Sequence, residues 1–156
     1  MSDATAQTHY FYDRHPISCE IILAKLRASR GHLDDLQPED LYPHDQDHYG
    51  GLAATDELAR GGQIEGGTRV ADFCAGLGGT VRYLARKYGA HVTGIELTPS
   101  RVAGARDLTQ RVGLRDRAQV VEGNVIPYQP WALTERNRRR EDSNAYEDPV
   151  GHCEYY

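Results

Sequence analysis

The sequence predicts an α/β protein in which short strands alternate with helices and form a parallel sheet. Three observations predict this class. An apolar run at 69–73 leads into a glycine-rich turn and a helix, a second run at 91–96 leads into another helix, and a third run lies at 118–121. Strands that alternate with helices of this length lie parallel in one sheet, with the helices packed on its faces.

Length and composition are those of one soluble domain. The 156 residues are 39% hydrophobic and 26% charged, and the formal net charge is −5. An acidic balance argues against general nucleic-acid binding, so we expect no nucleic-acid partner. No run is long and apolar enough to span a bilayer. We therefore expect no membrane contact. The three cysteines are scattered and are typical of reduced thiols, so we expect a cytoplasmic protein without a metal site.

Residues 1–50 are predicted to hold one helix and irregular structure. The chain up to Tyr12 is polar and is expected to be loose. Apolar residues then recur at helical spacing between Pro16 and Gly31, and proline suits a first helical turn while glycine suits the end of a helix. The stretch 33–51 is rich in Asp, Pro, His and Tyr and is predicted to be irregular.

Residues 51–126 are predicted to form the first half of a nucleotide-binding domain. Apolar spacing marks the helices, and Thr98 with Pro99 supplies an N-cap and a first-turn proline. The expected elements are, in order, a helix over 52–60, a strand over 69–73, a helix that ends at Gly89, a strand over 91–96, a helix that begins at Pro99 and stops at Gly113, and a strand over 118–121.

The sequence DFCAGLGG at 72–79 is the most informative part of the chain. Its glycines let the backbone adopt positive φ and pass close to a ligand, and the following helix N-terminus favours an anionic group. Glu96 ends the next strand, where a carboxylate can accept hydrogen bonds from ribose hydroxyls. A dinucleotide would need a small residue at the position of Val81, so a dinucleotide-dependent oxidoreductase is the weaker interpretation.

Three segments together resemble a known family. DFCAGLGG at 72–79, GIEL at 94–97 and GNV at 123–125 are similar to the first three cofactor motifs of class I S-adenosylmethionine-dependent methyltransferases. The similarity is greatest to the type 11 small-molecule group, including methyltransferases of glycine, sarcosine and dimethylglycine. The resemblance implies a Rossmann-like three-layer sandwich with a parallel sheet, S-adenosylmethionine as cofactor and a small-molecule methyl acceptor.

The resemblance also implies which residues hold the cofactor. It assigns the methionine half to Asp72, Ala75, Gly76 and Gly78, the ribose to Glu96, the adenine to Leu97, Asn124 and Val125, and part of the pocket wall to Tyr49 with Asp47 and His48. Cys74 stands where the family commonly has glycine, and Asn124 replaces the usual aspartate. The amide oxygen of Asn124 can still accept a hydrogen bond from the adenine amine. No catalytic residue can be named.

The sequence is expected to hold only the N-terminal half of such a fold, with a helical N-terminal extension. A complete fold of the resembled family has seven strands, and the fourth lies beside the first. Without that neighbour the strand at 69–73 would expose an edge that can pair with another chain. We therefore expect self-association and doubtful activity. The alternative is a non-catalytic remnant or interaction module that pairs through this edge. Residues 127–156 are expected to form a disordered tail.

Overall fold

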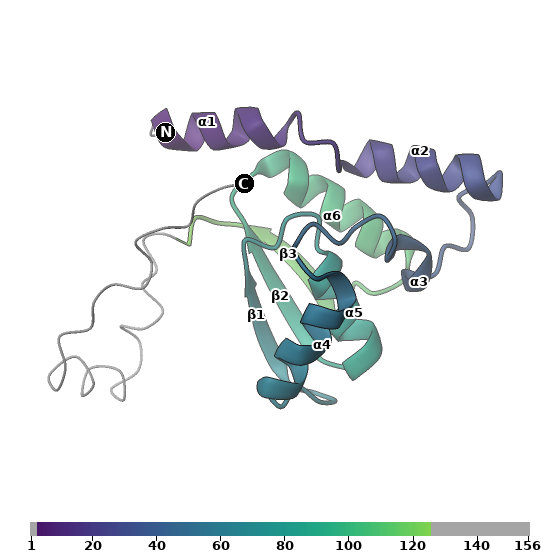
Figure 1. Cartoon of the computed structure of the whole chain (residues 1–156), viewed down its shortest axis with the longest axis vertical. Helices are drawn as coiled ribbons and strands as arrows, with labels where there is room; N and C mark the ends of the chain where they lie inside the picture. The colour runs from purple at the N-terminus through teal and green to yellow at the C-terminus, as the bar shows by residue number, and fades with distance from the viewer. Residues whose placement is uncertain (1–2, 126–156) are drawn as a thin grey trace, which may run out of the picture. The chain divides into compact units, whose positions relative to one another are not determined.

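The computed structural model describes residues 3–125, so the predicted tail at 127–156 lies outside the described residues. Among the described residues no helix is long and apolar enough to cross a bilayer, and the cytoplasmic location stays a prediction. The elements are α1 (Asp3–Tyr12), α2 (Cys19–Arg30), α3 (Pro38–Leu41), α4 (Gly51–Gly61), β1 (Arg69–Phe73), α5 (Gly79–Tyr88), β2 (His91–Glu96), α6 (Pro99–Arg111) and β3 (Ala118–Glu122) (Figure 1).

The three strands form one parallel sheet in the order β1-β2-β3. Val70 lies opposite Val92, which in turn lies opposite Ala118. The predictions for β1 and β2 are confirmed at both ends, and β3 runs one residue further than predicted, to Glu122. The α/β class is therefore confirmed. Within residues 3–125, β1 and β3 are the edge strands.

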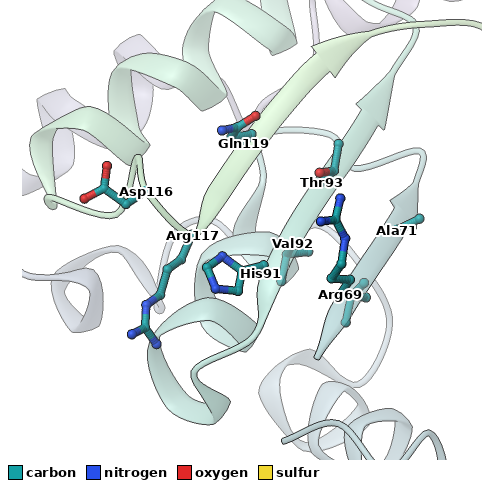
Figure 2. A pocket seen from close by; sticks show the side chains of 9 residues that line it. Arg69, Ala71, His91, Val92, Thr93, Asp116, Arg117 and Gln119 are labelled. Carbon is teal, nitrogen blue, oxygen red and sulfur yellow. The ribbon is translucent and has the colours of Figure 1, made fainter. Parts of the chain in front are cut away.

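The helices pack on one face of this sheet. That face buries Val92, Ala118 and Val120 against a core of helical side chains that includes Val81, Leu84, Val102 and Ala105. The opposite face carries alternating exposed residues and forms a shallow hollow of about 390 Å³ lined by Arg69, His91, Thr93, Arg117 and Gln119, among others (Figure 2). Within the described residues the expected three-layer sandwich is thus present as two layers.

Gly94 in β2 lets α5 approach the sheet closely. A Cβ at Gly94 would lie 2.6 Å from the Cβ of Ala75 and 2.9 Å from Cγ2 of Val81. In a dinucleotide-binding unit a small residue on the helix allows this approach, whereas here the missing side chain is on the strand. The fully buried Val81 is accommodated by Gly94, so the strand and not the helix supplies the small residue at this contact.

The N-terminal segment is helical where the sequence predicts a loose chain. Long-range contacts hold α1 in place. The ring Nε2 of His9 lies 3.2 Å from the carbonyl oxygen of Leu97, and the hydroxyl of Ser100 donates to Asp13, just beyond α1, at 2.6 Å. These partners lie almost ninety positions away, so local apolar periodicity could not indicate them.

The next two helices also differ from the prediction. α2 begins at Cys19, with Ser18 as its N-cap accepting from the backbone N–H of Ile21, and not in the turn that contains Pro16. Its end at Gly31, with φ +82°, is confirmed. The one-turn helix α3 lies inside the stretch predicted to be irregular, and the carboxylate of Asp40 accepts from the backbone N–H at its start.

A buried ion pair joins the segment before α4 to α5. Nη2 of Arg82 lies 2.8 Å from Oδ2 of Asp45, and neither side chain has exposed surface. Nη1 of Arg82 also donates to Thr109 Oγ1 (3.1 Å) and to the carbonyl of Ala105 (3.3 Å), both on α6. The backbone of Asp45 packs on Gly79, where any Cβ would collide with the Asp45 carbonyl oxygen. Arg82 therefore holds three segments together, namely the segment at Asp45, the start of α5, and α6.

We expect Asp45→Asn to lower the free energy of unfolding by about 3–5 kcal/mol, because it leaves a buried guanidinium without its counter-charge. Urea unfolding followed by circular dichroism measures the loss. Glu39→Gln is the matched control, since it removes the carboxylate from the half-exposed Glu39–Arg86 pair, where water screens the charges and the loss should be small. Equal losses in the two variants would contradict the structural role of the buried pair.

The residue that follows β1 has a left-handed backbone. Cys74 has φ +60°, a region that costs a residue with a Cβ about 1–2 kcal/mol. The family resemblance places glycine at this position, and the backbone conformation supplies the reason. The requirement at position 74 therefore concerns the backbone conformation more than the size of the side chain.

Cys74→Gly is expected to raise the free energy of unfolding by about 1 kcal/mol, because glycine adopts this conformation without a Cβ clash. Cys74→Ala removes the sulfur but keeps the Cβ, so it should give no comparable gain. Thermal and urea unfolding of both variants provide the measurement. A gain from alanine equal to that from glycine would show that the thiol, and not the backbone, carries the cost.

Candidate functional site

The glycine-rich loop lies at the carboxyl end of β1. Gly76 and Gly78 have φ of +54° and +76°, which glycine adopts without strain. The N–H of Gly78 donates to the carbonyl of Ala75 (2.8 Å), and the N–H of Ala75 donates to the carbonyl of Ile95 in β2 (3.1 Å). The loop is therefore closed on itself and fastened to the neighbouring strand, as a preorganised ligand loop requires.

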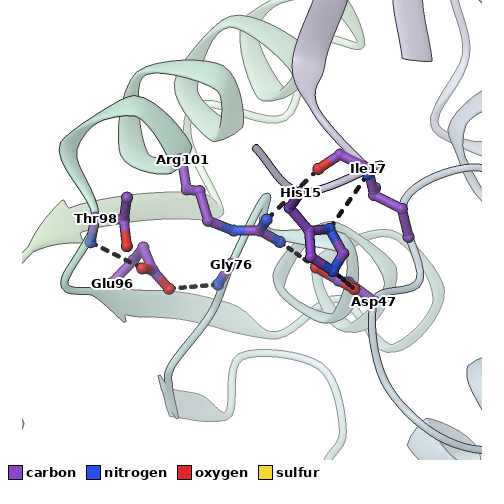
Figure 3. A network of polar contacts seen from close by, with 7 residues as sticks. All are labelled: His15, Ile17, Asp47, Gly76, Glu96, Thr98 and Arg101. Carbon is purple, nitrogen blue, oxygen red and sulfur yellow. Dashed lines mark hydrogen bonds and ion pairs between the residues drawn. The ribbon is translucent and has the colours of Figure 1, made fainter. Parts of the chain in front are cut away.

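Glu96 connects this loop to the start of α6. Its side chain is buried, with 6% exposed. Oε2 accepts from the N–H of Gly76 at 2.9 Å, and Oε1 accepts from the N–H of Thr98 at 2.8 Å (Figure 3). Thr98 occupies the predicted N-cap, but its hydroxyl makes no capping bond. The carboxylate of Glu96 thus satisfies a backbone donor at each of two turns.

Asp72 is the last acidic group before the loop and is half-buried in β1. Burial raises the pKa of the Asp72 carboxyl to about 6, while the charge of nearby His48 acts in the opposite direction. A carboxylate that has lost part of its hydration gains most from a cation placed beside it. Asp72 is therefore suited to a positively charged group of a ligand at this end of the sheet.

The residues predicted to contact an adenine lie at the ends of β2 and β3. Leu97 directly follows β2, and Asn124 and Val125 follow β3, all three half-buried. The N–H of Gly123 donates to the carbonyl of Glu96 at 2.9 Å, so the two strand ends are held side by side. Helix α1 reaches the same place through the contact of His9 with Leu97. The structure thus brings these residues to the carboxyl ends of the strands, where the glycine loop also lies.

The segment before α4 contributes charges to the site. Asp47 pairs with Arg101 of α6 and lies 3.8 Å from the ring of His15. His48 Nε2 contacts Gln46 at 3.2 Å, whereas the side chain of Tyr49 is fully exposed. In the described part of the chain no group of His, Cys, Asp and Glu is arranged to hold a metal ion. A pocket role for Tyr49 stays a prediction.

The sequence motifs do not indicate Arg101. Its guanidinium is buried next to Gly76 and reaches from α6 to Asp47 (Figure 3). A signal was available, because Arg101 precedes Ala105 and Leu108 by four and seven positions and so continues the buried stripe of α6. A charged residue on such a stripe needs a partner or a function.

Several curated methyltransferases share sequence with this chain, among them the following two. The glycine/sarcosine/dimethylglycine N-methyltransferase of Actinopolyspora halophila is 42% identical over 68 residues, which cover 42% of this chain and 12% of that protein. Methyltransferase phqN of Penicillium fellutanum is 34% identical over 101 residues, which cover 62% of this chain and 28% of that protein. The chain therefore matches less than a third of the length of either relative. No family model matches the sequence.

Among solved structures, the [4+2]-cyclase SpnF superposes with a TM-score of 0.50 and 23% identity, over 78% of this chain and 43% of that one. This likeness concerns the fold alone. The sequence identity to two methyltransferases carries the family assignment. The glycine loop, Glu96 and the end of β3 lie together at the carboxyl ends of the strands, where such a cofactor site is expected. The chain belongs to the class I S-adenosylmethionine-dependent methyltransferases.

Proposed function

We propose that this chain binds S-adenosylmethionine at the carboxyl ends of its three strands and serves methyl transfer to a small molecule, with an amine as acceptor. The observation that carries the proposal is the buried carboxylate of Glu96, which holds both Gly76 and the start of α6. Each of its oxygens accepts one backbone N–H, and a carboxylate offers roughly four lone-pair sites. Two acceptor sites of the Glu96 carboxylate therefore remain for two ribose hydroxyls.

The side chains present fit the charges of the cofactor. Asp72, desolvated at the end of β1, would face the ammonium of the methionine half, and Glu96 would face the ribose. The bound cofactor supplies a methyl group on a sulfonium centre. The chain's own residues would bind and orient that donor, which matters because a displacement requires both reactants close and aligned. The amine acceptor is suggested by the name of the Actinopolyspora halophila relative.

An interaction module is the second candidate. One observation favours it: within residues 3–125 no strand pairs with the outer edge of β1, and Phe73 at its end is 43% exposed. An uncovered edge strand is a template for pairing with another chain. Analytical ultracentrifugation combined with calorimetry separates the candidates. Binding of S-adenosylhomocysteine by a monomer supports the first, and self-association without binding supports the second.

Glu96→Ala is expected to weaken S-adenosylhomocysteine binding about ten- to a hundredfold, because charge-assisted hydrogen bonds contribute about 1.5–3 kcal/mol. Isothermal titration calorimetry measures the affinity, with NAD as the control ligand. Glu65→Ala removes an exposed carboxylate before β1 and should leave the affinity unchanged. Comparable losses in the two variants would end the ribose assignment.

Binding of S-adenosylhomocysteine should also depend on pH through Asp72. Its pKa is raised to about 6, so the free protein carries a protonated, neutral Asp72 below that pH. A ligand ammonium favours the ionised form, and binding must then release the proton. We expect affinity to rise about tenfold between pH 5 and pH 7 and to level off above. Asp72→Asn should bind more weakly and without this slope, so an unchanged slope in that variant would assign it to another group.

A further inference from the structure

Arg101 is a buried cation beside the glycine loop. Its side chain is 4% exposed, and its Nη2 would lie 3.0 Å from a Cβ placed on Gly76. The aromatic ring of Tyr12 covers the guanidinium, 4.8 Å away. A buried charge is costly unless it is paired and fully hydrogen-bonded. The position therefore calls for partners that satisfy the whole guanidinium.

The partners of Arg101 within the chain are incomplete. Nη2 pairs with Asp47, and Nη1 lies 3.5 Å from the carbonyl oxygen of Ile17, at the limit of a hydrogen bond. Nε is buried and has no hydrogen-bond partner among the described residues. A guanidinium presents its donors as a planar fork that matches a carboxylate at two points. Nε of Arg82 also lacks a partner, but of the two pairs only that of Arg101 includes a partly exposed carboxylate. At Arg101 a second or better placed acceptor can therefore reach the guanidinium.

Asp47 is a replaceable partner. Its side chain is 25% exposed and lies on the irregular segment between α3 and α4. The neighbouring pair of Asp45 with Arg82 has no exposed surface at all. His15 lies 3.8 Å from the other carboxylate oxygen of Asp47, so Asp47 keeps a polar neighbour if it leaves the guanidinium. Of the two pairs, this one is therefore open to exchange.

We propose that Arg101 is a carboxylate-binding residue of the ligand site and that Asp47 occupies its place in the unliganded chain. The inference rests on the proposed function. Both the methionine half of the cofactor and an amino-acid acceptor carry a carboxylate, and each would exchange with Asp47 at the same guanidinium. Together with Asp72, Arg101 would give the site one group for each charge of an amino-acid zwitterion.

Calorimetry with the full 156-residue chain tests this exchange. The probes are S-adenosylhomocysteine, its decarboxylated analogue, and sarcosine added to the chain saturated with S-adenosylhomocysteine. The variants are Arg101→Gln and Asp47→Asn. Arg111→Gln is the matched control, because it removes the same charge from the other end of α6, where Arg111 pairs with Asp107 on the surface.

A cofactor carboxylate predicts that Arg101→Gln weakens S-adenosylhomocysteine about ten- to a hundredfold and leaves the decarboxylated analogue unchanged. An acceptor carboxylate predicts that the same variant keeps S-adenosylhomocysteine binding and loses sarcosine. In either case Asp47→Asn should tighten the carboxylate ligand several-fold, because the internal competitor is neutralised, and Arg111→Gln should behave as the unmodified chain.

The sign of the Asp47→Asn effect is decisive even if Arg101→Gln fails to fold, because this variant keeps the arginine. Weaker carboxylate binding by Asp47→Asn would overturn the exchange and make Asp47 a positioning residue. The carboxylate site alone would be overturned by a different result. In that result Arg101→Gln changes the binding of S-adenosylhomocysteine and of its decarboxylated analogue equally, and it leaves sarcosine binding unchanged. An unmodified chain that binds neither S-adenosylhomocysteine nor sarcosine would overturn the proposed function, and the carboxylate site with it.

Discussion

The buried pair of Arg82 and Asp45 is the constraint on which the site depends. Arg82 stands in the first turns of α5, directly after the glycine loop, and its Nη1 reaches Thr109 on α6. Because the pair has no contact with water, breaking it would leave a charge in the core at a cost of several kcal/mol. The pair therefore fixes α5, α6 and the segment at 45–48 with respect to one another, and Asp45 in turn closes the space at Gly79.

Two residues after Asp45 the same segment meets a second arginine under different conditions. Asp47 is partly exposed, whereas Asp45 has no exposed surface. The sealed pair fixes the position of the segment, and the open pair places a charged group beside Gly76. A single irregular segment thus has a structural contact at Asp45 and a contact suited to exchange at Asp47, two positions later. This spacing is physically consistent, because an exchangeable partner is useful only if its backbone is held in place.

The sequence predicted the elements whose signals are local. The strands at 69–73 and 91–96 were found at both ends because glycines bound them and apolar residues fill them. Glu96 ends β2 as predicted, because the strand is followed by a helix that begins at Pro99, and its role as a ligand residue stays a prediction. Helix α1 and Arg82 were missed because their partners are distant in sequence, as with Arg82 and Asp45, 37 positions apart. Arg101 was missed although its place on the buried stripe of α6 was a local signal. The left-handed Cys74 was likewise visible only in the backbone.

Within residues 3–125, the candidate site is held from one of the two faces of the sheet. The core that positions α5 and α6 lies on the face that Val92 and Val120 share, and the loop, Glu96 and Arg101 are held from that side and from the strand ends. The hollow on the opposite face, lined by Arg69 and Thr93 among others, contributes none of these contacts. The geometry of the loop, Glu96 and Arg101 therefore follows from contacts within residues 3–125.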